Sequence, residues 1–249
     1  MSLIPVVFIK LALKLDQMKK ALLILSIFSL FFLSACSKFE DLEALLNDQV
    51  TITSVAVFNA VPNSQHIEVS IDGVKLNTGK EKLAYGKHLP FRNWPAGKKK
   101  ITIVNSYKGG EDVYEDFVDL EAGQIYSLFV YKDNKLGVVQ SKDDMIKPSA
   151  GFAKVRVAHM SNDAPPFVIH YGNDKQLYQS EIKYRDVTPF TNVNLANMRL
   201  MVNATKAGAT PQLDYSFTPK NQGIYTFLIR GHIHSTSESD EFEAQLIEH

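Results

Sequence analysis

Cysteine is almost absent from the sequence: its 249 residues contain one, at position 36. No disulfide can form within the chain, so its stability has to come from packed apolar cores. Net charge is also missing, because 27 lysines and arginines balance 27 aspartates and glutamates. Binding to nucleic acid depends on a basic field, so we expect no nucleic-acid partner.

Motifs for catalysis and for cofactor binding are absent as well. The sequence contains no GxSxG nucleophile elbow, and no HExxH motif, glycine-rich phosphate loop or calcium loop. Carboxylates pair only in runs typical of a solvated surface, such as residues 111–116. Because no nucleophile stands beside a base and an orienting group, we predict a protein that is not an enzyme and has no cofactor. A hydrolase is the less favoured alternative.

Seven histidines raise the question of a metal site. His232 and His234 are two residues apart, so on a strand both side chains would project from one face. A zinc site needs three or four ligands, and the sequence supplies no obvious third one. We therefore predict no metal site, with the pair at an exposed strand end; stabilisation by zinc would favour the alternative.

The single cysteine follows an apolar run. Lys19 and Lys20 precede the uncharged residues 21–35. This run is shorter than the roughly 20 residues of a membrane-spanning helix, and its basic start and small-residue end are typical of a secretory signal peptide. We predict a signal peptide over residues 1–35, with translation starting at Met18; a second membrane segment before Met18 is the alternative.

The tetrapeptide Leu33-Ser34-Ala35-Cys36 resembles the lipobox of bacterial lipoproteins. The resemblance implies cleavage before Cys36 and acylation of its sulfur and its new amino group. One acyl chain anchors a protein only marginally, whereas several hold it firmly. We therefore expect an exported protein whose partner is the outer membrane, through the lipid on Cys36, on the periplasmic or the surface face. Residues 36–49 would be the tether; an accidental free cysteine is the alternative.

The remaining chain repeats itself. Residues 55–73 match residues 155–173 in their order of apolar and polar positions, and residues 123–133 match residues 222–232. Chance similarity between two strand-rich segments is the alternative, since alternation alone produces some matching.

Each copy has the pattern of short strands joined by tight turns, and beyond residues 41–48 no helical period competes. In the first copy, we expect strands at residues 53–60, 66–72, 100–106, 114–120, 125–131 and 136–140. This spacing predicts an all-β fold of two tandem immunoglobulin-like antiparallel β-sandwich domains. The domains would cover residues 50–143 and 153–249, joined by a linker at residues 144–152.

The segment from Leu120 to Tyr126, LEAGQIY, resembles the tyrosine corner of immunoglobulin-like domains. The resemblance implies that the Tyr126 hydroxyl bonds a backbone group upstream and pins the crossover between sheets. In the second copy Tyr225 is present, but Gly223 stands one place nearer to it, which leaves the corner open there.

Residues 155–165, VRVAHMSNDAP, resemble the DUF4397 family, a domain of unknown function. Its members carry a His-x-Ser-Pro-Asp-Ala-Pro-like loop between two strands; here Asn162 replaces the first proline, and Asn59 takes the place of His159 in the first copy. The resemblance implies a β-sandwich on an exported bacterial protein, often in tandem, and no established activity.

These observations together predict a non-catalytic outer-membrane or cell-surface lipoprotein that presents two sandwich modules for binding or adhesion to a glycan or a protein. The alternative is a structural spacer in a cell-envelope assembly. Because recognition sites lie preferentially on loops, residues 59–65 and 159–166 are the first surfaces to probe. Trp94, the sole tryptophan, could stack on a sugar or close a sandwich end.

Overall fold

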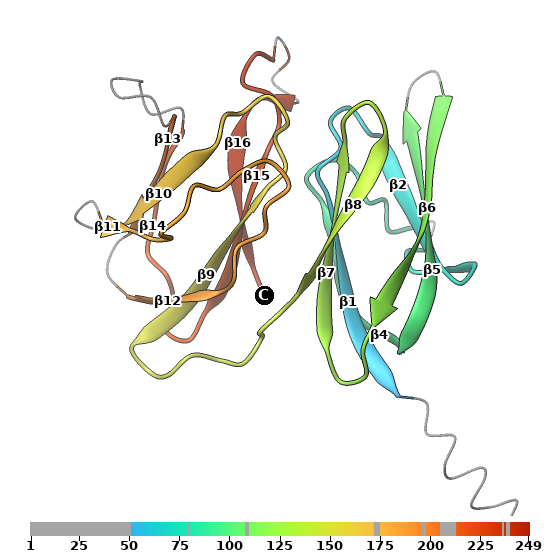
Figure 1. Ribbon diagram of the computed structural model, residues 1–249, viewed down its shortest axis with the longest axis horizontal. Coiled ribbons are helices and arrows are strands. Elements are labelled where there is room, and N and C mark those ends of the chain that lie inside the picture. The colour runs from blue at the N-terminus through green and yellow to red at the C-terminus, as the bar shows by residue number, and fades with distance from the viewer. Residues whose placement is uncertain are drawn as a thin grey trace, which may run out of the picture. The chain divides into compact units, whose positions relative to one another are not determined.

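The computed structural model describes residues 51–78, 80–107, 110–171, 175–195, 198–204, 213–235, 237 and 240–249. Residues 51–249 cluster as one compact unit, and the described part of them is built from strands without an α-helix (Figure 1). The predicted all-β class is confirmed. Within these ranges no helix has the length and apolar character needed to cross a membrane. The predicted signal peptide, the tether and Cys36 lie outside the described residues.

The first half of this unit forms two four-stranded sheets. Sheet A has the strand order β4-β1-β7-β8 and sheet B the order β3-β2-β5-β6. Their strands are β1 (Ile52–Asn59), β2 (His66–Ile71), β3 (Val74–Lys75), β4 (His88–Pro95), β5 (Gly97–Tyr107), β6 (Gly110–Leu120), β7 (Ile125–Lys132) and β8 (Leu136–Lys142). The hairpin between β2 and β3 turns at Asp72 and Gly73, which take φ values of 50° and 78°, as a tight primed turn requires.

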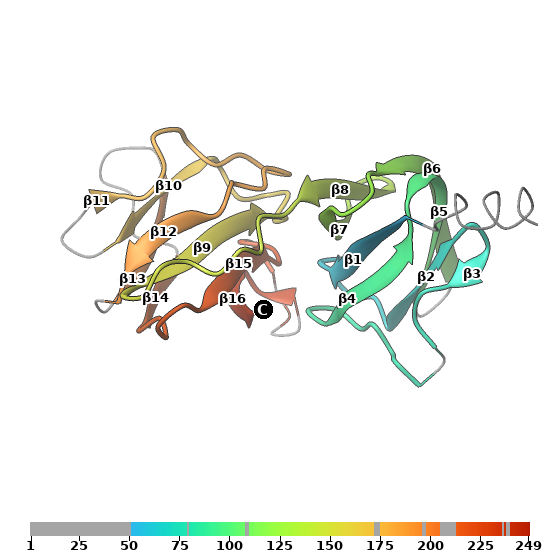
Figure 2. The same cartoon turned by 90° about the horizontal axis from the view of Figure 1, so that it is seen from below.

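The second half repeats this arrangement. Sheet C has the order β12-β9-β15-β16 and sheet D the order β11-β10-β13-β14 (Figure 2). Their strands are β9 (Phe152–His159), β10 (Phe167–Tyr171), β11 (Lys175–Gln176), β12 (Thr191–Asn194), β13 (Met198–Ala204), β14 (Leu213–Phe217), β15 (Ile224–Arg230) and β16 (Glu243–Glu248). We call sheets A and B the first sheet pair and sheets C and D the second sheet pair.

The strand order departs from the immunoglobulin arrangement that the sequence predicts. In an immunoglobulin constant domain the first and second strands share a sheet, whereas β1 lies in sheet A and β2 in sheet B. β1 pairs antiparallel with β4 and parallel with β7, and β9 pairs parallel with β15 in the same way. Parallel neighbours cannot be joined by a tight turn, and the chain passes through β4 and all of sheet B between β1 and β7.

Each sheet pair encloses its own apolar core. In the first pair, alternating residues of β1 and β7 such as Val55, Val57 and Leu128 pack against Ile101 and Ile103 of sheet B. In the second pair, equivalent positions of sheet C pack against Phe167 and Ile169 of sheet D. The two-residue period of the strands produces this one-sided packing.

Sheets A and C also bury their other faces, against each other. A third apolar cluster joins Phe58 and Phe129 of sheet A to Ala158, Leu228 and Ile247 of sheet C. Strands buried on both faces read as nearly continuous apolar runs, and β1, β7, β9 and β15 are buried along most of their length. We call this contact surface the A–C interface. It contains the buried polar and aromatic contacts that are described next.

Candidate functional site

The A–C interface is approximately symmetric with respect to the sequence repeat. Tyr85 of the first copy corresponds to Tyr184 of the second, and Tyr131 corresponds to Arg230. The Arg230 guanidinium lies 4.1 Å from the centre of the Tyr85 ring, and Tyr184 meets Tyr131 edge to face with ring centres 5.8 Å apart. Matching positions therefore contact each other at both ends of the interface, as in a two-fold dimer.

A buried arginine joins the two sheet pairs at the middle of this interface. The Arg156 guanidinium of β9 forms an ion pair with Asp143, and the two side chains are 1% and 0% exposed. Its Nη2 donates to Ser127 Oγ of β7 at 2.9 Å, and its Nε donates to Thr226 Oγ1 of β15 at 2.9 Å. Asp143 follows β8 directly, so one side chain of sheet C is bonded to two segments of the first sheet pair.

Aromatic rings cover the two faces of this guanidinium. Its carbon lies 4.4 Å from the centre of the Phe190 ring and 5.4 Å from that of Phe129. A planar guanidinium suits this position, because it can stack on rings while its edge donates to a carboxylate. Burial lowers the pKa of Arg156, and Asp143 opposes that change. All N–H groups of the Arg156 guanidinium have partners, so the guanidinium is fully bonded within the apolar layer.

His249 completes the polar group beside Arg156. Its Nε2 lies 2.7 Å from Thr226 Oγ1, and its ring is near those of Phe91 and Phe190. Burial lowers the pKa of His249 to about 3, helped by the positive charge of Arg156. The imidazole is consequently neutral at ordinary pH and adds no second positive charge to the interface.

The loop at residues 159–166 is held in place by buried side chains. His159 is fully buried, Met160 and Ser161 are nearly so, and the Ser161 amide donates to His159 Nδ1 at 3.3 Å. Asp163 accepts backbone N–H bonds from Ile233 at 3.0 Å and His234 at 3.3 Å. The Asp163 carboxylate therefore stabilises a turn and links two loops of the second sheet pair.

The loop at residues 59–65 has the same design. Asn59 Oδ1 accepts the Val61 amide at 2.9 Å, as His159 Nδ1 accepts the amide two residues later in the second copy. Its Nδ2 donates to Ser64 Oγ at 2.8 Å and to the Leu83 carbonyl at 2.9 Å. At the exposed tip, Asn63 donates to Asp240 Oδ2 of the second sheet pair at 3.1 Å. The buried residues of both loops are thus scaffold, which leaves the exposed ones, such as Asn63, Asn162 and Pro165, for recognition.

One of the paired histidines lies near an acidic side chain. His232 Nδ1 lies 3.8 Å from Asp163 Oδ1, and His234 lies in the adjoining turn. Across the ranges that the structure describes, no group of three or more histidine, cysteine or acidic side chains could hold a metal ion.

Trp94 lies on β4 and packs, partly buried, against the core of the first sheet pair. A residue in this position covers one end of the apolar core. Of the two alternatives left by the sequence, this packing favours the closing of a sandwich end.

Tyrosine hydroxyls occupy equivalent positions in both copies. Tyr126 accepts the Glu121 amide at 3.2 Å, and Tyr225 accepts the Lys220 amide at 3.0 Å. Gln222 takes a φ of 62° at the place of Gly123, whose φ is 72°. In the second copy the glycine stands at position 223 because a larger residue would not fit there. A Cβ at Gly223 would lie 2.5 Å from the Tyr225 hydroxyl.

We expect Tyr126→Phe to lower the free energy of unfolding by about 1 kcal/mol, the usual net contribution of one hydrogen bond. The ring would keep its packing in the core, so the loss isolates the bond to the Glu121 amide. Chemical denaturation of the variant measures it, with Tyr225→Phe as the matched change in the second copy. No loss in either variant would show that these hydroxyls do not stabilise the turns.

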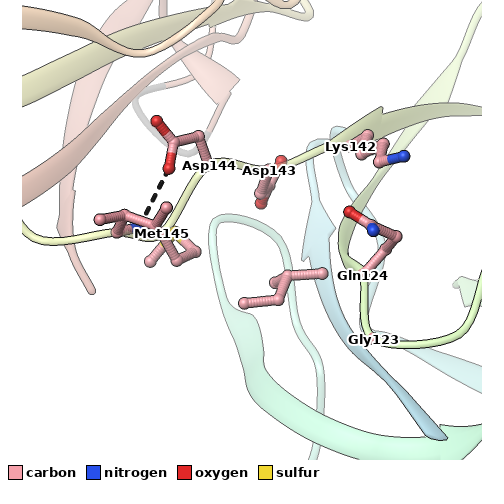
Figure 3. Close-up of a pocket in the computed structure, with 8 residues that line it drawn as sticks. Gly123, Gln124, Lys142, Asp143, Asp144 and Met145 are labelled. Atoms are coloured by element: carbon pink, nitrogen blue, oxygen red, sulfur yellow. Dashed lines mark hydrogen bonds between the residues drawn. The ribbon is translucent and has the colours of Figure 1, made fainter.

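A shallow cavity of about 490 Å³ lies where the chain leaves β8. Figure 3 shows Gly123 and Gln124 on one side and the segment from Lys142 to Met145 on the other. Ile125 and Ile146 complete the lining. The Ile146 amide donates to Asp144 Oδ1 at 3.1 Å, which fixes the bend of this segment.

Part of this chain is similar to a known protein family. A family model for a domain of unknown function, DUF4397, matches residues 53–170. This region is thus similar to the DUF4397 family. The match confirms the predicted resemblance; it begins on β1 and ends on β10, so the DUF4397 region contains all of the first sheet pair and the loop around His159. No curated protein matches the chain, and the family description names no activity.

The sequence reasoning missed the A–C interface. Arg156 lies in the strand sequence VRVAH, where alternation alone assigns it to an outward, solvated face. The available signal was the run of apolar residues without alternation in β1 and β7, where Ala56, Phe58 and Phe129 occupy the supposed outer face. Such runs indicate strands covered on both sides.

Proposed function

We propose that the chain is a non-catalytic lipoprotein of the cell envelope, anchored through Cys36, whose two tandem β-sandwiches act as one rigid module for binding or adhesion to a glycan or a protein. The observation that supports this proposal most directly is the set of bonds made by Arg156. This side chain of one sandwich is bonded to two segments of the other. A fixed arrangement of two domains lowers the entropic cost of engaging a large partner.

Several side chains in residues 59–65 and 159–166 are buried scaffold, so another exposed surface is the first candidate for the proposed contact. On the edge strand β6, Val113 and Phe117 are 55% and 58% exposed, and the Lys98 ammonium lies 5.4 Å from the centre of the Phe117 ring. Exposed aromatic and aliphatic side chains beside charges are common in interaction surfaces. We therefore regard the outer face of sheet B as the first surface to test by substitution.

The second candidate is a structural spacer in an envelope assembly. The same observation favours it, because a spacer needs a fixed distance between its ends and the A–C interface provides a rigid connection. Capture of one stoichiometric protein partner supports the spacer, whereas binding of purified chain to glycans on an array supports adhesion. Protease treatment of intact cells would show which face of the membrane carries the domains.

We expect Cys36→Ala to release the protein from the membrane fraction, because the acyl chains would have no sulfur to which they can be attached. Fractionation of cells that express the variant measures this release. Ser37→Ala is the matched control and should stay with the membrane. Unchanged membrane association of Cys36→Ala would contradict the anchor.

A further inference from the structure

The most exposed large apolar side chain of the described chain is Ile146, which is 77% exposed. It lines the cavity drawn in Figure 3, as Met145 and Ile125 also do. A single exposed isoleucine is ordinary, but here three apolar side chains line one shallow depression. We call Ile52, Ile125, Met145 and Ile146 the linker patch.

The linker patch adjoins the point at which β1 begins. The Gly123 amide, on the cavity wall, donates to the Ile52 carbonyl at 2.7 Å, and Thr53 Oγ1 donates to the Gln124 carbonyl at 2.8 Å. Ile52 itself is 50% exposed. The patch therefore surrounds the start of the folded unit, to which residues 36–50 are covalently joined.

The charges around the linker patch are mutually compensated. Lys142 pairs with Glu121 at 2.9 Å, Lys154 pairs with Asp144 at 2.6 Å, and the Asp143 carboxylate is enclosed by Arg156. The exposed Lys147 follows Ile146 directly. An apolar surface with paired acids and a lysine at its margin can approach a phospholipid headgroup without electrostatic repulsion, and interfacial segments combine these features.

We propose that the linker patch rests on the lipid surface of the membrane that carries the anchor, and so orients the two sandwiches relative to the bilayer. This inference depends on the lipid anchor proposed above. The tether alone does not impose the contact, because an extended chain spans up to about 3.5 Å per residue and would let the domains lift away. Burial of the exposed apolar area in the headgroup region supplies the attraction.

The test uses the lipidated protein in vesicles of phosphatidylethanolamine and phosphatidylglycerol. Ile146→Cys introduces a thiol for a polarity-sensitive maleimide dye, while acylated Cys36 offers no free thiol. Because interfacial side chains lie about 5–10 Å into the headgroup and acyl boundary, brominated lipids should reduce the dye's emission by roughly half. Val74→Cys, at a side chain that is 59% exposed on β3, is the matched control and should keep its emission.

The outcomes separate the two proposals. Flotation of the protein with vesicles, together with equal emission of both dyes in plain and brominated lipid, would overturn the docking of the linker patch and leave the anchor intact. Labelling of the wild-type chain by the dye, or its failure to float, would overturn the anchor and the docking with it. Selective quenching at position 146 supports the proposal.

Discussion

Arg156→Ala should lower the free energy of unfolding by about 3–5 kcal/mol, because breaking a buried ion pair leaves the other charge without compensation. The Asp143 carboxylate is 0% exposed and would keep only its bond with Ser127. The aromatic rings of Phe129 and Phe190 would lose the guanidinium between them. Equilibrium unfolding in urea at pH 7 measures the loss.

Two controls separate this effect from general damage. Lys142→Ala removes a surface ion pair with Glu121, in which both side chains are about half exposed, and should cost less than 1 kcal/mol. The double change Arg156→Met with Asp143→Leu removes both buried charges and should recover much of the stability, since apolar pairs often replace buried ion pairs without loss. A loss at Arg156→Ala no larger than that at Lys142→Ala would contradict the bridging role.

Acid should destabilise the fold through His159. Burial lowers the pKa of this histidine to about 4 from a usual value of 6.5, against the opposing effects of Asp186 and the Pro165 carbonyl. As the pH falls below 6.5 the unfolded chain takes up a proton that the folded chain refuses until about pH 4. The free energy of unfolding should therefore fall by about 3 kcal/mol across this window.

His159→Asn tests this assignment with the residue that the first copy uses at the same place, Asn59. Urea unfolding at pH 7 and at pH 4.5 should show a clearly smaller pH-dependent loss in the variant than in the wild type. His249 remains in the variant with its lowered pKa, so part of the dependence should persist. Equal losses in both proteins would mean that His159 does not carry the effect.

The strands of the first sheet pair could be predicted with good accuracy because they alternate. β5 and β6 have one face toward the core and one toward solvent, so their period of two is visible. β4 was missed because Pro90, Arg92 and Asn93 interrupt its pattern. Its pairing with β1 is settled by tertiary contact, which local propensity does not encode.

The order of the strands could not be derived from the same pattern. Alternation shows which side chains share a face, but not which strand lies beside which. The parallel pairing of Val55 with Tyr126 joins residues that sheet B separates in sequence. The bond between the Glu121 amide and the Tyr126 hydroxyl joins residues five apart in the sequence, so a local motif could point to it.

The interface chemistry required knowledge of packing between sheets. Nothing adjacent to Arg156 in sequence indicates its partners, since Asp143 lies at the start of the segment between β8 and β9 and Thr226 lies on β15. The sequences of the two loops that contain Asn59 and His159 resemble exposed turns. The side chains of Asn59 and His159 are nevertheless fully buried. Polar residues that serve as buried connectors therefore resemble recognition residues when only sequence is considered.

The central claim is that both sheet pairs behave as one unit through the A–C interface. Urea unfolding of the wild-type chain, followed in parallel by Trp94 fluorescence and by far-ultraviolet circular dichroism, tests it most directly. Trp94 reports only the first sheet pair, whereas the dichroism reports all strands. One coincident transition is the predicted result, and two transitions at clearly separate urea concentrations would contradict the account.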